Sequence, residues 1–353
     1  MKKKKRFYTP FFASFCCMAV VMAALVVPSG CGSSDAMTGT ENTQKRQDAG
    51  SGSTGKGDGA GTAATEKIMT EDKETETLEK EAGRQAVLVV SFGTSYNESR
   101  KATIGAIEKD IETAFPAYEV RRAFTSQIII DKLKERDGLM IDNVEEALDR
   151  AVADGITTLV VQPTHLMKGY EYTDLAEELD AYRDRFEQIE LAEPLLTEDA
   201  DFDAVTNAIA ERTASYDDGE TAICFMGHGT EADANAVYGK LQEKITAAGF
   251  ENYYIGTVEA EPGLEDVIAA MKEKGTYKKV VLAPLMVVAG DHANNDMAGD
   301  DDDSWKSILE KEGFEVECIL EGLGQNASIR QIYTDHTRAA VDAAAKEKTE
   351  KTH

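Results

Sequence analysis

The sequence predicts an α/β protein with two similar lobes, each holding a four-stranded parallel sheet flanked by helices. From Ala86 onward, short β-branched runs alternate with amphipathic stretches, and the second half repeats the first in outline. Strands separated by helices require crossover connections, which produce parallel sheets. The expected strands cover residues 86–92, 118–124, 157–162, 189–196, 221–226, 253–258, 279–285 and 315–320. The expected helices cover residues 99–114, 143–153, 172–186, 201–214, 233–248, 264–274 and 328–348.

Short motifs that recur in the same order indicate an internal repeat. Each motif in the first half stands at the end of an expected strand, and its counterpart takes the corresponding place in the second half. The pairs are SFGT at 91–94 with MGHGT at 226–230, VVQP at 160–163 with VLAP at 281–284, and AEPL at 192–195 with LEGL at 320–323. We therefore place the lobes at residues 85–218 and 219–348.

The N-terminal segment, residues 1–31, has the pattern of an export signal. A basic cluster at 2–6 precedes an apolar run at 11–27, and small residues stand directly before Cys31. This arrangement resembles a bacterial lipoprotein site, at which Cys31 would be lipidated and hold the protein on the outer face of the cytoplasmic membrane. Ordinary cleavage and an uncleaved anchor are the alternatives. Residues 32–84 contain almost no large apolar side chain, so we expect a disordered acidic tether.

The balance of acidic and basic residues limits the kinds of molecule that the protein is expected to bind. Asp and Glu number 65 against 38 Lys and Arg, a net charge of -27, which opposes nucleic acid and favours cations. Beyond Cys31 the chain has only Cys224 and Cys318, each in an apolar strand-like run, so no disulfide framework exists and both are expected to be small buried side chains.

Three residues with metal-ligand chemistry follow expected strands of the second lobe. His228 follows the fifth strand, Glu259 ends the sixth and His292 comes shortly after the seventh. Ligands of open parallel sheets bind beyond the carboxyl ends of the strands. Two imidazoles and a carboxylate can hold a divalent first-row ion and leave coordination positions open. The sequence therefore predicts a metal site on this rim.

Each of these residues also has a simpler interpretation. His228, between two glycines, is either a polar turn residue or a group whose neighbours let a flat ligand approach the backbone. Glu259 competes with Glu261 and Glu265, which suit the start of a helix. His292 is either a core histidine or a metal ligand, and Asp291 would orient its imidazole in the second case.

Other charged groups fit both a structural and a functional role. His165 follows the third strand and either faces the same cleft or closes a turn. The carboxylates at 300–303 either favour a helix N-terminus or form a mouth that attracts cations. The basic residues of the first lobe either meet substrate carboxylates or form a solvated face; they are Arg121, Arg122, Lys132, Lys134 and Arg136.

Several nucleotide, metal and hydrolase signatures are absent. The chain has no HExxH, CxxC, GxxxxGK[ST] or GxSxG motif, and the glycines after Phe92 do not form GxGxxG, so nucleotide binding has no specific support.

The motifs at the strand ends resemble those of the anaerobic-type sirohydrochlorin cobaltochelatase family of the chelatase superfamily. The resemblance covers residues 86–344 and is most specific in its last motif. It rests on VVSFGTSY at 89–96, RAFTS at 122–126, FMGHG at 225–229, PLMVVAGDHANNDM at 284–297 and DDSWK at 302–306. It implies a chelatase-like fold with the active site in the cleft between the lobes.

The resemblance also implies the activity, insertion of Co²⁺ into the carboxylate-rich tetrapyrrole sirohydrochlorin in cobalamin biosynthesis, without nucleotide hydrolysis. His228, Glu259 and His292 would bind the metal, with His228 as the base that accepts pyrrole protons and Glu259 as a second catalytic residue. The candidate substrate-binding residues are Phe92, Gly93, Thr94, Ser95, His165 and Gly229. Such ligands also suit Fe²⁺, Ni²⁺ or Zn²⁺, and the resemblance leaves room for a homo-oligomer.

The export signal departs from the biosynthetic pattern, because sirohydrochlorin is made and used in the cytoplasm. The alternative function is therefore an exported protein that binds haem, another tetrapyrrole or metal for uptake or storage. An uncleaved anchor facing the cytoplasm would restore the pathway, but the basic cluster before the apolar run opposes that orientation.

Overall fold

The computed structural model describes residues 83–351, and their side chains as far as residue 346. The predicted export signal, the lipidation of Cys31 and the tether up to residue 82 lie outside the described residues. Within the described part, no helix is long and apolar enough to cross a bilayer.

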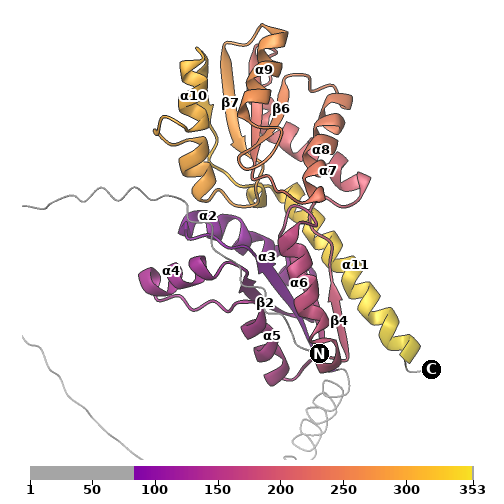
Figure 1. Ribbon diagram of the computed structural model, residues 1–353. Helices are drawn as coiled ribbons and strands as arrows, with labels where there is room; N and C mark the ends of the chain where they lie inside the picture. Colours follow the sequence, from indigo (N-terminus) through magenta and orange to yellow (C-terminus); the bar gives the residue numbers. More distant parts are fainter. Residues whose placement is uncertain (1–82, 352–353) are drawn as a thin grey trace, which may run out of the picture. The chain divides into compact units, whose positions relative to one another are not determined.

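Two four-stranded parallel sheets confirm the predicted fold class (Figure 1). Neighbouring strands of the first sheet are β2 (Glu119–Phe124), β1 (Arg84–Ser91), β3 (Ile156–Pro163) and β4 (Gln188–Leu191). Those of the second are β6 (Tyr253–Thr257), β5 (Thr221–Gly227), β7 (Lys279–Pro284) and β8 (Glu315–Cys318). The strand order is the same in both sheets, so the repeat in the sequence is a repeat in the topology. We call them the first and second lobe.

Helices cover both faces of each sheet. In the first lobe, α5 (Val144–Ala153) and α6 (Tyr170–Asp180) pack on one face. The other face carries α3 (Ile104–Ala114) and α11 (Ala327–Lys351). In the second lobe, α7 (Asp199–Thr213) and α8 (Ala236–Ala247) lie on one side. The other side carries α9 (Leu264–Lys274) and α10 (Trp305–Lys311).

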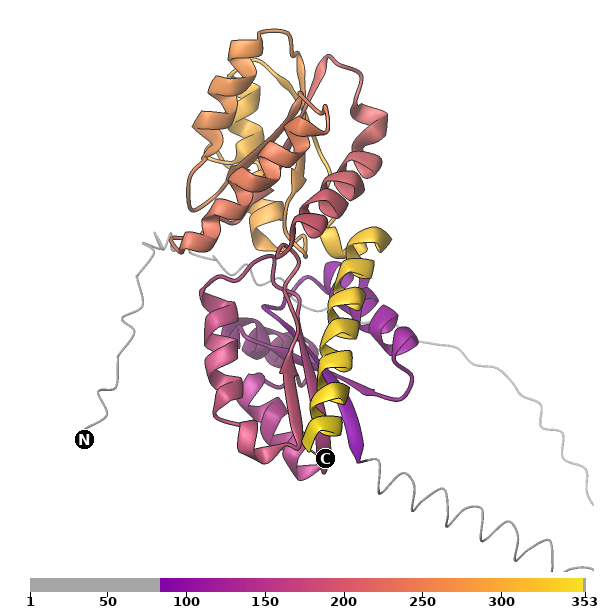
Figure 2. The ribbon, with the colours of Figure 1, turned by 90° about the vertical axis from the view of Figure 1, so that its right-hand side faces the viewer.

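Two helices therefore pack outside their own half of the chain. Helix α7 follows the first sheet but contacts α8, while α11, the last helix, runs along β3 and β4 of the first lobe (Figure 2). One hydrophobic core joins them, since it includes side chains from both sheets, α7 and α11. The boundary predicted at residues 218 and 219 stays a prediction, and the contacts add that each half supplies a helix to the other.

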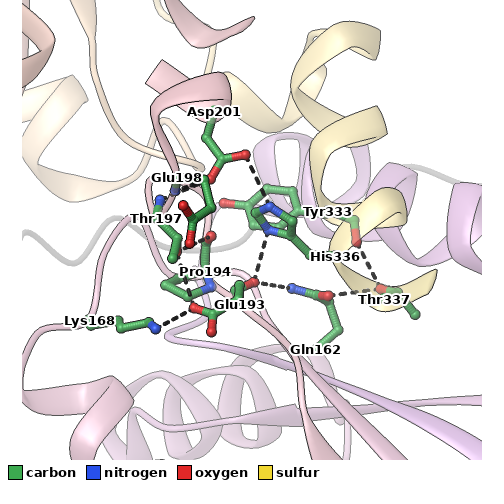
Figure 3. Close-up of polar contacts among 10 residues, drawn as sticks. All are labelled: Gln162, Lys168, Glu193, Pro194, Thr197, Glu198, Asp201, Tyr333, His336 and Thr337. Carbon is green, nitrogen blue, oxygen red and sulfur yellow. Dashed lines mark hydrogen bonds and ion pairs between the residues drawn. The ribbon is translucent and has the colours of Figure 1, made fainter. Parts of the chain in front are cut away.

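Buried polar contacts fasten α11 to the first lobe (Figure 3). The Tyr333 hydroxyl donates to the carbonyl oxygen of Thr164 at 3.0 Å, and the Thr337 hydroxyl donates to Gln162 Oε1 at 2.8 Å. The His336 ring lies between the carbonyl oxygen of Glu193, 3.2 Å from Nδ1, and the Asp201 carboxylate, 3.1 Å from Nε2. The helix is thus tied to the loop after β3 and to the connection after β4.

The observed helices differ from the expected ones in the first lobe. The helix expected at 99–114 divides into α2 (Asn97–Ala102) and α3 at Thr103, whose backbone angles, φ -111° and ψ -80°, are not helical. Helix α4 (Gln127–Asp137), which was not among the expected helices, ends at Gly138 in the left-handed conformation that favours glycine.

Candidate functional site

Hydrogen bonds beyond the ends of β5 and β6 position two of the three predicted ligands. The register pairs Gly227 with Thr257, and the Glu259 amide then donates to the carbonyl oxygen of His228 at 2.8 Å. His228 and Glu259 are therefore neighbours across adjacent strands. Gly229 follows with φ +87°, and a Cβ there would lie 2.8 Å from the Ala260 amide nitrogen. The tight turn after His228 thus needs a glycine.

The third residue comes from the other neighbour of the central strand. After β7, a loop leads to one π-helical turn, η4 (Ala293–Met297), and His292 immediately precedes this turn. Ligand atoms of His228, Glu259 and His292 all lie within 4.8 Å of one another. The imidazole rings of the two histidines meet edge to face, with their centroids 4.7 Å apart. The three groups predicted at the strand ends form one cluster.

Hydrogen bonds to Nδ1 fix the orientation of both imidazole rings. His228 Nδ1 lies 2.9 Å from the carbonyl oxygen of Gly229, and His292 Nδ1 lies 2.6 Å from Asp296 Oδ2. Because both oxygens accept, the proton of each neutral imidazole belongs on Nδ1, and Nε2 keeps its lone pair. His228 Nε2 is 3.8 Å from Glu259 Oε1. These Nε2 atoms are free to bind a metal or accept a proton.

The carboxylate that orients His292 differs from the one expected. The interpretation of His292 as a metal ligand assigned this role to Asp291, but Asp296 fills it. Asp291 Oδ1 instead accepts from the Tyr96 hydroxyl of the first lobe at 3.4 Å and from Asn295 Nδ2 at 3.0 Å. The signal in the sequence was the spacing of four between His292 and Asp296, which brings side chains together only if the segment is helical.

A carboxylate of the first lobe, missed in the sequence, lies near the cluster. Glu171 stands in the first turn of α6, and its Oε2 is 3.3 Å from His165 Nε2. Burial raises the pKa of the Glu171 carboxyl, and the charge of His228 partly offsets this rise. His165, Glu171 and His228 therefore lie in one electrostatic environment.

The candidate substrate-binding residues divide by exposure. Phe92 is 49% exposed, whereas Thr94, Ser95 and His165 are buried. Gly93 has φ +96°, and a Cβ there would lie 2.5 Å from the Phe124 ring, so this turn too needs a glycine. Four of the five exposed large apolar side chains in the described part follow a strand end; they are Phe92, Ile128, Tyr170 and Leu320, after β1, β2, β3 and β8. Exposed apolar side chains thus accompany the clustered histidines and glutamate on the segments that follow the strands.

The charged groups with two interpretations are partly explained by ion pairs. Arg121 pairs with Glu119 and Asp154, and Arg122 pairs with Glu108. In the acidic run, Asp300 pairs with Lys306 and Asp302 with Lys311 of α10. Cys224 is buried as expected, but Cys318 is only partly buried.

The titration of His165 gives a testable prediction about stability. Burial lowers the pKa of its imidazole from 6.5 to about 4. Between these values the unfolded chain binds the proton and the folded protein does not, so the free energy of unfolding falls as the pH falls from 6.5 to 4. A His165→Asn variant lacks this titration. Urea unfolding measures the free energy of unfolding at pH 7 and at pH 4.5. Between these pH values it should fall by about 2–3 kcal/mol more in the wild type than in the variant. An equal fall in both proteins would contradict the effect of burial on His165.

Fold and site together define a two-lobed α/β protein with a candidate site for a divalent transition metal beyond the strand ends. A family model described as cobalt chelatase (CbiK) matches residues 85–342, so the chain belongs to the cobalt chelatase family.

Two curated relatives agree with this membership. The chain is 38% identical over 264 residues to the sirohydrochlorin cobaltochelatase of Salmonella typhimurium, covering 75% of this chain and 99% of that protein. It is 31% identical over 262 residues to the sirohydrochlorin cobaltochelatase CbiKC of Nitratidesulfovibrio vulgaris, covering 74% and 92%. The solved structure of SirB from Bacillus subtilis with Fe³⁺ matches with a TM-score of 0.54 and 13% identity, over 75% of this chain and 98% of that one, which supports the fold.

Proposed function

We propose that this protein inserts Co²⁺ into sirohydrochlorin. The observation that carries the proposal is the cluster of His228, Glu259 and His292, whose ligand atoms lie within 4.8 Å of one another. Two relatives that share its family are named sirohydrochlorin cobaltochelatase and match over most of their own length. The metal is a substrate in this reaction, so the site must release it as well as bind it.

The exposure of the cluster suits transfer of an ion to a second molecule. The side chains of His228, Glu259 and His292 are 47%, 56% and 35% exposed, whereas a closed structural site would bury its ligands. We propose that the two Nε2 atoms and the Glu259 carboxylate hold Co²⁺ while positions stay open toward the macrocycle. The same ligands accept Fe²⁺ or Ni²⁺, so selectivity for cobalt rests on the family.

Proton transfer must accompany insertion, because two pyrrole N–H groups lose their protons as the ion binds the four ring nitrogens. His228 Nε2 regains its lone pair when the ion moves to the ring nitrogens, and we propose that it then accepts one of the two protons, since the Gly229 carbonyl keeps the proton of the neutral ring on Nδ1. The second proton passes to solvent, to which the cluster is exposed. Glu259 Oε1, 3.8 Å away, would stabilise the imidazolium that forms. No step of this sequence requires a nucleotide.

The apolar rim would receive the macrocycle. Phe92, directly after β1, and Tyr170, the first residue of α6, are 49% and 60% exposed, and a flat conjugated ring buries such side chains favourably. The glycines at positions 93 and 229 keep the adjoining turns free of side chains. Export and lipid anchoring through Cys31 remain part of the proposal, to be tested by mass spectrometry of the mature N-terminus.

Anaerobic absorption spectroscopy tests the function directly. The purified full chain is mixed with sirohydrochlorin and Co²⁺, and a parallel sample is titrated with haem. We expect the spectrum of the metal-free macrocycle to convert to that of the cobalt complex at a rate proportional to protein concentration. Tight haem binding without enhanced insertion would instead identify an exported tetrapyrrole carrier.

A further inference from the structure

A pocket of about 560 Å³ with a mixed polar and apolar lining lies between the two lobes, and Asn294, two residues after His292, is part of its wall. The connection from β1 to α2 forms one wall, α4 forms another, and loops of the second lobe complete it. The polar lining that matters here comes from Ser95, Asn97, Ser99, Lys132, Arg136 and Asn294. A pocket of this volume has ample room for a carboxylate arm of a large ligand.

The pocket shares residues with the loop that carries His292. The Tyr96 hydroxyl, in the pocket wall, donates to Asp291 Oδ1 at 3.4 Å, and Asp291 directly precedes His292. Asn294, two residues after His292, lines the pocket and donates to the carbonyl oxygen of Gly290 at 2.7 Å. A Cβ on Gly290 would lie 3.4 Å from Thr94 Oγ1, so the two lobes meet closely here. These contacts place the pocket next to the loop that carries His292.

The pocket holds a cation without a partner in a very acidic chain. Lys132 makes no hydrogen bond or ion pair within residues 83–346, whereas most basic groups nearby are paired. Arg136 is fixed by Asp137, by the carbonyl oxygen of Ser95 and by Asn97 Oδ1. One carboxylate, Glu98, also lines the pocket. Lys132 thus offers an available positive charge.

Further observations indicate an anion. Burial lowers the pKa of Arg100, the charge of Arg122 adds to this effect and that of Asp137 opposes it, so basic groups lie close together on this side of the first lobe. The hydroxyl of Ser99 is buried without a hydrogen-bond partner in the described part. An acceptor that enters the pocket would meet a cation and a free donor together.

We propose that this pocket binds a carboxylate arm of the tetrapyrrole and that Lys132 recognises its charge. The inference rests on the proposed function and adds a determinant of specificity. A chain with net charge -27 repels a polyanionic macrocycle over its surface as a whole. A local cation beside the metal cluster offsets that repulsion and favours macrocycles with many carboxylates over those with two.

Charge reversal on α4 tests the inference. Lys132→Glu is compared with Lys134→Glu, an exposed lysine of the same helix that lies outside the pocket lining. Fluorescence titrations use the full chain with two probes, the octacarboxylate uroporphyrin and the dicarboxylate mesoporphyrin. We expect Lys132→Glu to weaken uroporphyrin binding about tenfold and mesoporphyrin binding less than about threefold. Lys134→Glu should change either affinity less than about threefold.

Salt dependence provides a second readout. Raising the ionic strength should weaken uroporphyrin binding more steeply in the wild type than in Lys132→Glu, because the variant has lost an attractive charge. Equal effects of the two substitutions on uroporphyrin would overturn the subsite and leave the proposed function intact. A wild type that binds neither porphyrin and inserts no cobalt would overturn both.

Discussion

Replacing His228 with alanine is expected to lower kcat/KM for cobalt insertion by about 1000-fold or more. The change removes a proposed metal ligand and the proposed proton acceptor at once, and loss of a general base alone is typically worth about 100- to 10,000-fold. Because the side chain is 47% exposed, the free energy of unfolding should change by less than about 1 kcal/mol. Initial rates followed by absorption, together with urea unfolding, separate the two effects.

Two glutamates of the same loop provide the matched control. Glu259 belongs to the cluster, whereas Glu261, two residues later, does not. Glu259→Gln should reduce insertion and weaken Co²⁺ binding, and Glu261→Gln should leave both within about twofold of the wild type. If His228→Ala keeps wild-type turnover, or if the two glutamine variants behave alike, the assigned site is wrong.

The three clustered residues were predictable because parallel topology makes strand ends meet. Once residues 221–226, 253–258 and 279–285 were expected as parallel strands, the side chains that follow them had to share one edge of the sheet. The choice of Glu259 over Glu261 did not follow from this rule. The register of β5 and β6 selects Glu259, because the Glu259 amide donates to the His228 carbonyl oxygen and so brings these two side chains together.

The residues that were missed depend on geometry that the sequence pattern does not carry. Asp296 reaches His292 only because residues 293–297 form a helical turn, in a segment with no amphipathic period. Glu171 approaches His228 from the opposite lobe, so no spacing along the chain relates them. Contacts between lobes follow from tertiary packing and not from local propensity.

The packing of α7 and α11 against the opposite half of the chain was also not predictable from the sequence. The sequence predicts a helix at 328–348 but does not predict which sheet this helix covers. An amphipathic pattern shows that a helix has an apolar face, but it does not show which element packs against that face. The position of Tyr333, fully buried with its hydroxyl on a carbonyl of the first lobe, shows where that face packs.

We expect Tyr333→Ala to lower the free energy of unfolding by about 3–5 kcal/mol. The substitution leaves a cavity between α11 and the first sheet and removes the hydrogen bond to the Thr164 carbonyl. Tyr170→Ala is the control, since that tyrosine is 60% exposed and its loss should cost less than about 0.5 kcal/mol. Urea unfolding monitored by circular dichroism measures both variants, and an unchanged m-value would show that the folded state keeps its compactness.

Tyr333→Phe separates packing from hydrogen bonding in the same place. The ring stays, but the Thr164 carbonyl loses its partner, whereas the His165 carbonyl keeps the Leu195 amide as a donor. The cost should therefore be only about 1–2 kcal/mol. If α11 merely rested on the first lobe, both substitutions would be nearly neutral. If the helix completes the first lobe, as its core contacts indicate, truncating one tyrosine at the far end of the chain should destabilise the loop after β3 that carries His165.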